Sequence, residues 1–328
     1  MANDADQELQ KVVKTVCLIE GEMRDEEGNP VPYKGTGLYF GGGWIMTVAH
    51  NFQDDIERNE TTHSILSDAR FQVKFDVGGQ EYVFQEHQRM AFIHHLEPGE
   101  DADPKNKDIA MVKLGHQWGY GGRDYPTWER EEHEMLKAMG AEDFALAKID
   151  PPTPKKDETV YAVHFGGAND DKKSEESKIL RITPTSLPWY QRCCCCCRLP
   201  NQAVPMLHLE KKIGVLPAGS SGCPIMIKKE DKYYLVGLHF SGDADDVDGE
   251  AEALPWSQGI HDYIDRGVGI IAEIGSYMGN RKAVSEGAGS LEEDLNEEAD
   301  KSLKELKRMA RDAKLTIYLC NGVVINQQ

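Results

Sequence analysis

The chain has 328 residues, of which 40% are hydrophobic, so it is long enough for more than one domain and can bury a core. Its 56 acidic residues against 37 basic ones give a net charge of −19, with no extended basic patch, which argues against a nucleic-acid ligand. No apolar run reaches the length of about 18 residues that a transmembrane helix needs.

Two short apolar strands joined by a glycine turn are predicted over residues 35–48, and the second one leads into Thr47-Val48-Ala49-His50. His50 therefore stands at a strand end, where it can project into a cleft. Further on, the polar loop 99–107 leads to Asp108, which opens the apolar strand 109–114. Taken singly, the histidine could be a structural residue and the aspartate a turn former. We interpret His94 and His95, which lack such a context, as structural.

A helix is predicted over residues 127–139, closed by Gly140, between two strand-rich regions. The second region begins near residue 157, with strands expected over 159–165, 178–183 and 204–209. Many short runs rich in Val, Ile, Tyr and Phe, bounded by Gly, Asn and Pro, indicate an all-β body.

Five consecutive cysteines, Cys193 to Cys197, lie between two of these strands and are flanked by arginines. Adjacent cysteines are poorly spaced for disulfides or for a zinc site. The run could be an oddity of a surface loop, an acylated segment that tethers the protein to a membrane, or a redox-sensitive loop. We expect no metal and no cofactor.

A serine lies between glycines in Gly219-Ser220-Ser221-Gly222-Cys223-Pro224. Glycines on either side allow a sharp turn and a close approach of backbone N–H groups to a reacting carbonyl. Ser221 is thus a candidate nucleophile, although such a segment is by itself also typical of an exposed turn.

The segments around His50, Asp108 and Ser221 resemble, in this order, the three catalytic motifs of trypsin-like serine proteases of the chymotrypsin fold, and the resemblance covers residues 12–278. It implies two six-stranded antiparallel β-barrels, over about 12–115 and 157–280. It also implies that His50 acts as general base, that Asp108 orients it, and that the N–H groups of Gly219 and Ser221 form the oxyanion hole. Ser220 stands where digestive relatives carry the aspartate of zymogen activation, so we expect no such activation step.

The strand over residues 233–242 corresponds in this family to the one that pairs with an extended peptide substrate, through Phe240, Ser241 and Gly242. His239 stands where bacterial glutamyl endopeptidases and picornaviral main proteases have a histidine that recognises Glu or Gln at P1. Those enzymes usually add a Thr or Ser five residues before the nucleophile, where this chain has Leu216 with Val215 beside it, both apolar. A polar P1 side chain bound by His239 and an aromatic or aliphatic one in an apolar pocket both remain open.

The family's last strand is expected over residues 266–274, and the protease domain over 12–280. A tail over 286–328 follows, with a helix predicted from about 290 to 314 by its capping box and apolar spacing. Asn321-Gly322 then predicts a β-hairpin. The tail could dock on its own barrel, form oligomers or bind a partner.

These observations predict an all-β, chymotrypsin-like serine endopeptidase with a helical and hairpin tail, acting on a protein or peptide bound as an extended strand. A protease-fold module that binds peptides but cleaves them poorly is the alternative. Since the first residues lack the apolar core of a secretory signal, we expect an intracellular, cytoplasmic protein. Within the trypsin-like family, the chain resembles an intracellular member of eukaryotic type.

Overall fold

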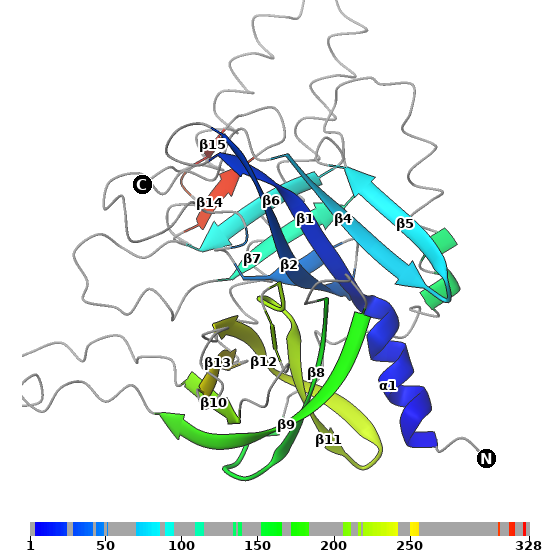
Figure 1. The fold of residues 1–328 in the computed structure, drawn as a ribbon, viewed down its shortest axis with the longest axis vertical. Coiled ribbons are helices and arrows are strands. Elements are labelled where there is room, and N and C mark those ends of the chain that lie inside the picture. The colour runs from blue at the N-terminus through cyan, green and yellow to red at the C-terminus, as the bar shows by residue number, and fades with distance from the viewer. Residues whose placement is uncertain are drawn as a thin grey trace, which may run out of the picture.

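Strands make up most of the chain that the computed structural model describes: residues 4–24, 29–41, 44–48, 51, 70–85, 89–94, 109–114, 134–135, 137–139, 152–165, 172–183, 206–210, 216–217, 219–241, 250–255, 308, 315–318 and 324–325. Figure 1 shows these strands in two bodies, one above the other, with the helix α1 (Asp4–Thr15) beside them. The candidate nucleophile lies where the two bodies meet.

The first body is a nine-stranded sheet with the order β15-β14-β6-β7-β3-β2-β1-β4-β5. Its described strand pairs are antiparallel, so neighbouring strands can be joined by short turns. The strands are β1 (Val16–Arg24), β2 (Pro30–Gly41), β3 (Trp44–Thr47), β4 (Arg70–Val77), β5 (Gln80–Gln85), β6 (Arg89–His94), β7 (Ala110–Leu114), β14 (Leu315–Tyr318) and β15 (Val324–Ile325).

The second body is a closed six-stranded barrel with the order β10-β13-β12-β11-β8-β9. Closure removes the exposed edges that an open sheet would leave unpaired. Its strands are β8 (Thr159–Phe165), β9 (Lys172–Thr183), β10 (Met206–Glu210), β11 (Pro224–Lys229), β12 (Lys232–Ser241) and β13 (Glu250–Pro255).

Two-residue turns set the register of one hairpin in each body. Gly78 and Gly79 have φ values of 65° and 84° and join β4 to β5, which is the conformation that tight hairpins require. Glu230 and Asp231, with φ values of 48° and 62°, join β11 to β12 in the same way. The second turn has no glycine, so its left-handed residues must be held by the strands on either side.

Each body has its own apolar core. Strand β4 buries alternate residues, Val73, Phe75 and Val77, as expected when one face of a sheet is covered. Phe75 meets Tyr39 and Phe84 edge to face, at centroid distances of 6.4 Å and 6.1 Å. The barrel core is built from Val160, Ala162, Ile179, Leu207, Leu209, Leu216, Cys223, Ile225, Ile227, Val236, Ala251 and Ala253.

The N-terminal helix α1 was not predicted from the sequence; it extends to Thr15, and the first strand, β1, begins at Val16. The helix buries Val12, and Lys172 of the barrel donates hydrogen bonds of 2.9 Å from Nζ to the carbonyls of Val13 and Asp76. This ammonium therefore joins the last turn of α1, the first sheet and the barrel. Burial lowers its pKa from 10.5 to about 8, although the charge of Asp76 opposes the shift.

The C-terminal hairpin pairs with the chain's own first sheet. Strands β14 and β15 are antiparallel, as the Asn-Gly signal predicted, while the turn itself lies outside the described residues. Strand β14 pairs with β6, Leu315 opposite His94. Of the three alternatives for the tail, docking on its own body is therefore the one found for these strands. The helix predicted for 290–314 is described only at residue 308, which is helical.

The expected all-β class is confirmed, and a closed six-stranded barrel beside a second sheet is consistent with the chymotrypsin-like fold. Residues 134–135 and 137–139 are helical, in agreement with the helix predicted there. Closure of the first sheet into a second barrel and the domain limits stay predictions. Among the described residues, no helix is long and apolar enough to cross a bilayer.

Candidate active site

The turn that carries Ser221 is shaped by two glycines in the left-handed region, Gly219 with φ 92° and Gly222 with φ 86°. At Gly222 a side chain is also excluded by space, because a Cβ there would lie 2.1 Å from the Thr47 hydroxyl oxygen and 2.3 Å from the Thr36 carbonyl oxygen. Both neighbours belong to the first sheet. The glycine thus lets a turn of the barrel lie directly against that sheet.

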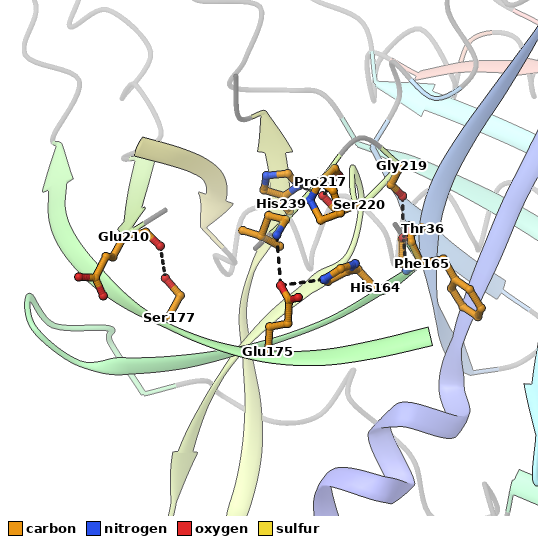
Figure 2. A network of polar contacts seen from close by, with 11 residues as sticks. Thr36, His164, Phe165, Glu175, Ser177, Glu210, Pro217, Gly219, Ser220 and His239 are labelled. Atoms are coloured by element: carbon orange, nitrogen blue, oxygen red, sulfur yellow. Dashed lines mark hydrogen bonds and ion pairs between the residues drawn. The ribbon is translucent and has the colours of Figure 1, made fainter. Parts of the chain in front are cut away.

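Thr36 of β2 also holds this turn through hydrogen bonds. Its backbone N–H donates to the Ser221 carbonyl at 2.8 Å, and its hydroxyl donates to the Gly219 carbonyl at 2.9 Å. The same hydroxyl accepts from the Phe165 N–H of β8 at 3.1 Å (Figure 2). Thr36 is completely buried, so water does not compete for these bonds. One threonine therefore joins the sheet, the barrel and both residues of the predicted oxyanion hole.

The direction of the peptide groups suits an anion-binding turn. The Ser220 carbonyl accepts from the Cys223 N–H at 3.0 Å, and because the peptide is trans, the Ser221 N–H points the opposite way. Neither this N–H nor that of Gly219 has an acceptor among the described residues. Two such backbone donors are what an oxyanion hole needs.

Ser220 and His239 form a buried link behind the turn. The Ser220 hydroxyl donates its single hydrogen to the Pro217 carbonyl at 2.6 Å. Its contact of 3.2 Å with His239 Nδ1 must then be donated by the histidine. This places a proton on Nδ1 of His239, a residue that is 2% exposed. Both interpretations of His239, as a P1 ligand or as a structural residue, stay open.

Glu175 of β9 anchors the segment that leads into the turn. Its Oε2 accepts the Leu216 N–H at 3.2 Å and lies 3.0 Å from Nε2 of the fully buried His164 (Figure 2). Burial acts to raise the pKa of Glu175, but the hydrogen bond and charge of His164 outweigh it, so that the pKa lies below its ordinary value. Leu216 has φ 54°, a conformation that a leucine keeps only when its surroundings hold it.

Cys223 lies two residues after Ser221 and is the other nucleophilic side chain of the turn. It is fully buried, and burial raises the pKa of its thiol well above the ordinary range, with a further contribution from the charge of Glu175. A thiol that stays protonated at neutral pH is a poor nucleophile. This leaves Ser221 as the candidate nucleophile of the turn.

The predicted site residues are only partly described. His50, Asp108, Val215 and Gly242 lie outside the described residues, as does the run Cys193 to Cys197. Leu216 is buried in the barrel core, and its place in a substrate pocket stays a prediction. The other five predicted positions, Gly219, Ser221, His239, Phe240 and Ser241, lie in the turn or in the adjoining strand β12.

Strand β12 runs past the end of its neighbour β11. The pairing of the two strands ends at Pro224 opposite Leu238, and His239 is bonded through its N–H to the Cys223 carbonyl at 2.9 Å. On its other side the register with β13 shifts between His239 and Ser241. A strand end that extends beyond its partner, beside the nucleophile turn, is a suitable place for strand addition by a peptide.

Sequence reasoning assigned no role to Thr36, Asn51 or Glu175. Asn51 follows His50 directly, and its Nδ2 donates to Thr47 Oγ1 at 2.9 Å and to the Ser221 carbonyl at 3.1 Å. A signal for Thr36 existed in Gly35-Thr36-Gly37, since glycines around a small polar residue indicate a close backbone approach. No signal marks Glu175, which lies in a run of charged residues. Among the described residues, no group of three or more His, Cys, Asp or Glu could hold a metal ion.

Comparisons with known proteins give structural likenesses only. No protein-family model and no curated protein sequence matches the chain. The thermostable serine protease AL20 from an extremophilic microorganism is similar at 11% identity and a TM-score of 0.45, over 77% of this chain and 95% of that one. The protease Anisep from Arthrobacter nicotinovorans is similar at 12% identity and a TM-score of 0.45, over 77% and 94%. The active form of the Rv3671c protease from M. tuberculosis is similar at 15% identity and a TM-score of 0.40, over 75% and 78%.

Proposed function

We propose that the protein is a serine endopeptidase that cleaves peptide bonds through an acyl-enzyme on Ser221. His50 acts as the general base and Asp108 as the acid that orients it. The geometry of the turn at 219–222 carries this proposal. Acyl transfer requires a sharp turn at the nucleophile, a fixed backbone and N–H groups that are available to an oxyanion. The turn has two left-handed glycines, a Ser221 carbonyl held by a hydrogen bond, and two backbone N–H groups without acceptors in the described part of the chain.

Strand register supports the two partners of Ser221. Thr47 of β3 pairs with Ala110 of β7 in an antiparallel ladder. In such a ladder, the chain that leaves β3 and the chain that enters β7 lie at the same end. His50 follows this pair by three residues and Asp108 precedes it by two. The sequence therefore attaches both residues to the sheet end that also carries Asn51, which is bonded to the Ser221 carbonyl.

The chemistry follows from these roles. The hydroxyl of Ser221 is a weak nucleophile, so His50 takes its proton as the oxygen attacks the scissile carbonyl. The resulting oxyanion is stabilised by the N–H groups of Gly219 and Ser221. His50 then gives the proton to the leaving amine, and water hydrolyses the acyl-enzyme by the reverse sequence. Asp108 keeps the imidazole in the required tautomer throughout.

The substrate in this proposal is a protein or peptide that extends β12 through Phe240, Ser241 and Gly242. The first sheet and the barrel correspond to the two halves of a chymotrypsin-like protease over 12–280. Because Ser220 is already bonded to Pro217 and His239, the turn is held without a charge from a new N-terminus. The proposal accordingly includes no activating cleavage.

Fluorophosphonate labelling tests the proposed function. Wild-type protein should be labelled on Ser221, as located by mass spectrometry of the digested product, and Ser221→Ala should not be labelled. Ser174→Ala removes an exposed serine of β9 and serves as the matched control that keeps full labelling. Equal labelling of wild type and Ser221→Ala would contradict the role of Ser221.

A further inference from the structure

Asn51 joins the strand end that precedes it to the nucleophile turn of the barrel. Its side chain donates from Nδ2 to Thr47 Oγ1 at 2.9 Å and to the Ser221 carbonyl at 3.1 Å, and its backbone N–H donates to the Val48 carbonyl at 3.3 Å. The residue is 4% exposed. Asn51 is thus tied to its own strand and to the barrel at the same time.

Donor and acceptor capacities allow only one arrangement of this link. The Thr47 hydroxyl gives its single hydrogen to the Thr36 carbonyl at 2.7 Å, so towards Asn51 it can only accept. The Ser221 carbonyl has no hydrogen to donate and also accepts from the Thr36 N–H. Both hydrogens of the Asn51 amide are therefore required, and the orientation of the amide follows from its partners.

The site also has no spare space. A Cβ at Gly35 would lie 2.3 Å from Nδ2 of Asn51, closer than real Cβ atoms approach. Gly35 therefore leaves the room in which the amide sits. The side chain is enclosed by Gly35, Thr47 and the Ser221 turn, which favours a single rotamer.

We propose that Asn51 is a positioning residue that sets the place of the general base relative to the nucleophile. The proposal rests on the proposed roles of His50 and Ser221. Asn51 is covalently joined to residue 50, and its amide is bonded to the backbone of Ser221 itself. A displacement of about 1 Å between reacting groups can cost about 10²-fold in rate. A direct hydrogen bond between the residue that follows His50 and the backbone of Ser221 should therefore have a large effect on the rate.

Asn51→Asp is the sharpest test because it keeps the shape and removes the donors. A carboxylate has acceptor oxygens only, and these would face the acceptors on Thr47 and Ser221. We expect the second-order rate of fluorophosphonate labelling to fall by about 10²-fold. Asn29→Asp makes the same chemical change at an exposed position and should leave the rate unchanged.

A measurement that needs no catalysis separates this proposal from the proposed function. In protein with ¹³C-labelled histidine, the His50 signal is identified by its loss in His50→Gln. Ser221→Ala should shift this signal in the wild-type background and leave it unchanged in the Asn51→Asp background. The same shift in both backgrounds, or no shift in either, would overturn the positioning role. Failure of the proposed function would instead appear as labelling that survives Ser221→Ala.

Asn51→Ala covers the case in which the aspartate variant does not fold, because it removes the bridge without opposing acceptors. Folding of each variant is checked by circular dichroism. In Asn51→Ala the labelling rate should again fall by about 10²-fold, and the effect of Ser221→Ala on the His50 signal should again be lost. Wild-type rates together with an unchanged effect on the signal would refute the proposal.

Discussion

Gly222→Ala tests whether the sheet and the barrel meet as closely as the structure shows. The added Cβ would lie 2.1 Å from Thr47 Oγ1 and 2.3 Å from the Thr36 carbonyl oxygen, so it opposes backbone as well as side chain. A non-glycine residue in the left-handed region costs about 1–2 kcal/mol. Overpacking of a close contact costs about 1–3 kcal/mol more. We therefore expect the free energy of unfolding to fall by about 2–5 kcal/mol.

Gly79→Ala is the matched control for the backbone contribution. Gly79 has φ 84°, close to the 86° of Gly222, but nothing lies within 4 Å of a Cβ built there. Its substitution should cost only the conformational part, about 1–2 kcal/mol. The difference between the two variants then measures the close approach of the two bodies.

Urea unfolding, with melting temperature as a second measure, checks this prediction. The melting temperature should fall by about 2–4 °C per kcal/mol. Labelling of Ser221 should also slow in Gly222→Ala and stay normal in Gly79→Ala, because only the first variant displaces the turn. Equal destabilisation by the two substitutions would show that the contacts of Gly222 with Thr36 and Thr47 are not closely packed.

Two further predictions concern ionisable groups around the turn. The pKa of Glu175 in the folded protein lies below its ordinary value of 4.5, so its carboxylate stabilises the fold fully above pH 4.5 and progressively less as pH falls through the folded pKa. Unfolding measured from about pH 6 to about pH 3 should therefore show a smaller loss of stability in Glu175→Gln than in wild type, and an equal loss in both would contradict the role of the carboxylate. The pKa of Cys223 is raised by burial, and each pKa unit lowers the thiolate fraction at a given pH about tenfold. Because the thiolate is the reactive form, iodoacetamide at about pH 8 should modify Cys223 at least about tenfold more slowly in folded than in unfolded protein. Similar rates in the two states would refute its burial.

Much of the fold could be predicted because its signals are local. Alternation of apolar residues over a few positions is enough to indicate a strand. The two-residue segments Gly78-Gly79 and Asn321-Gly322 favour tight turns, and each lies between strands that pair as a hairpin. Helix α1 was missed even though its pattern is also local, with Leu9, Val12 and Val13 on one face and Lys14 in the last turn. The short helix lies in a polar segment, which masks its apolar face.

The candidate nucleophile could also be predicted, since both glycines of its turn lie within two residues of it in the chain. What the sequence by itself determined was therefore the β class, the hairpin at Asn321-Gly322 and Ser221 as the candidate nucleophile. The residues that hold Ser221 in place come from far away in the chain: Thr36 bonds to Gly219, and Asn51 bonds to Ser221. Only the tertiary structure decided these contacts, because their strength depends on burial and on which donors and acceptors the two bodies bring together.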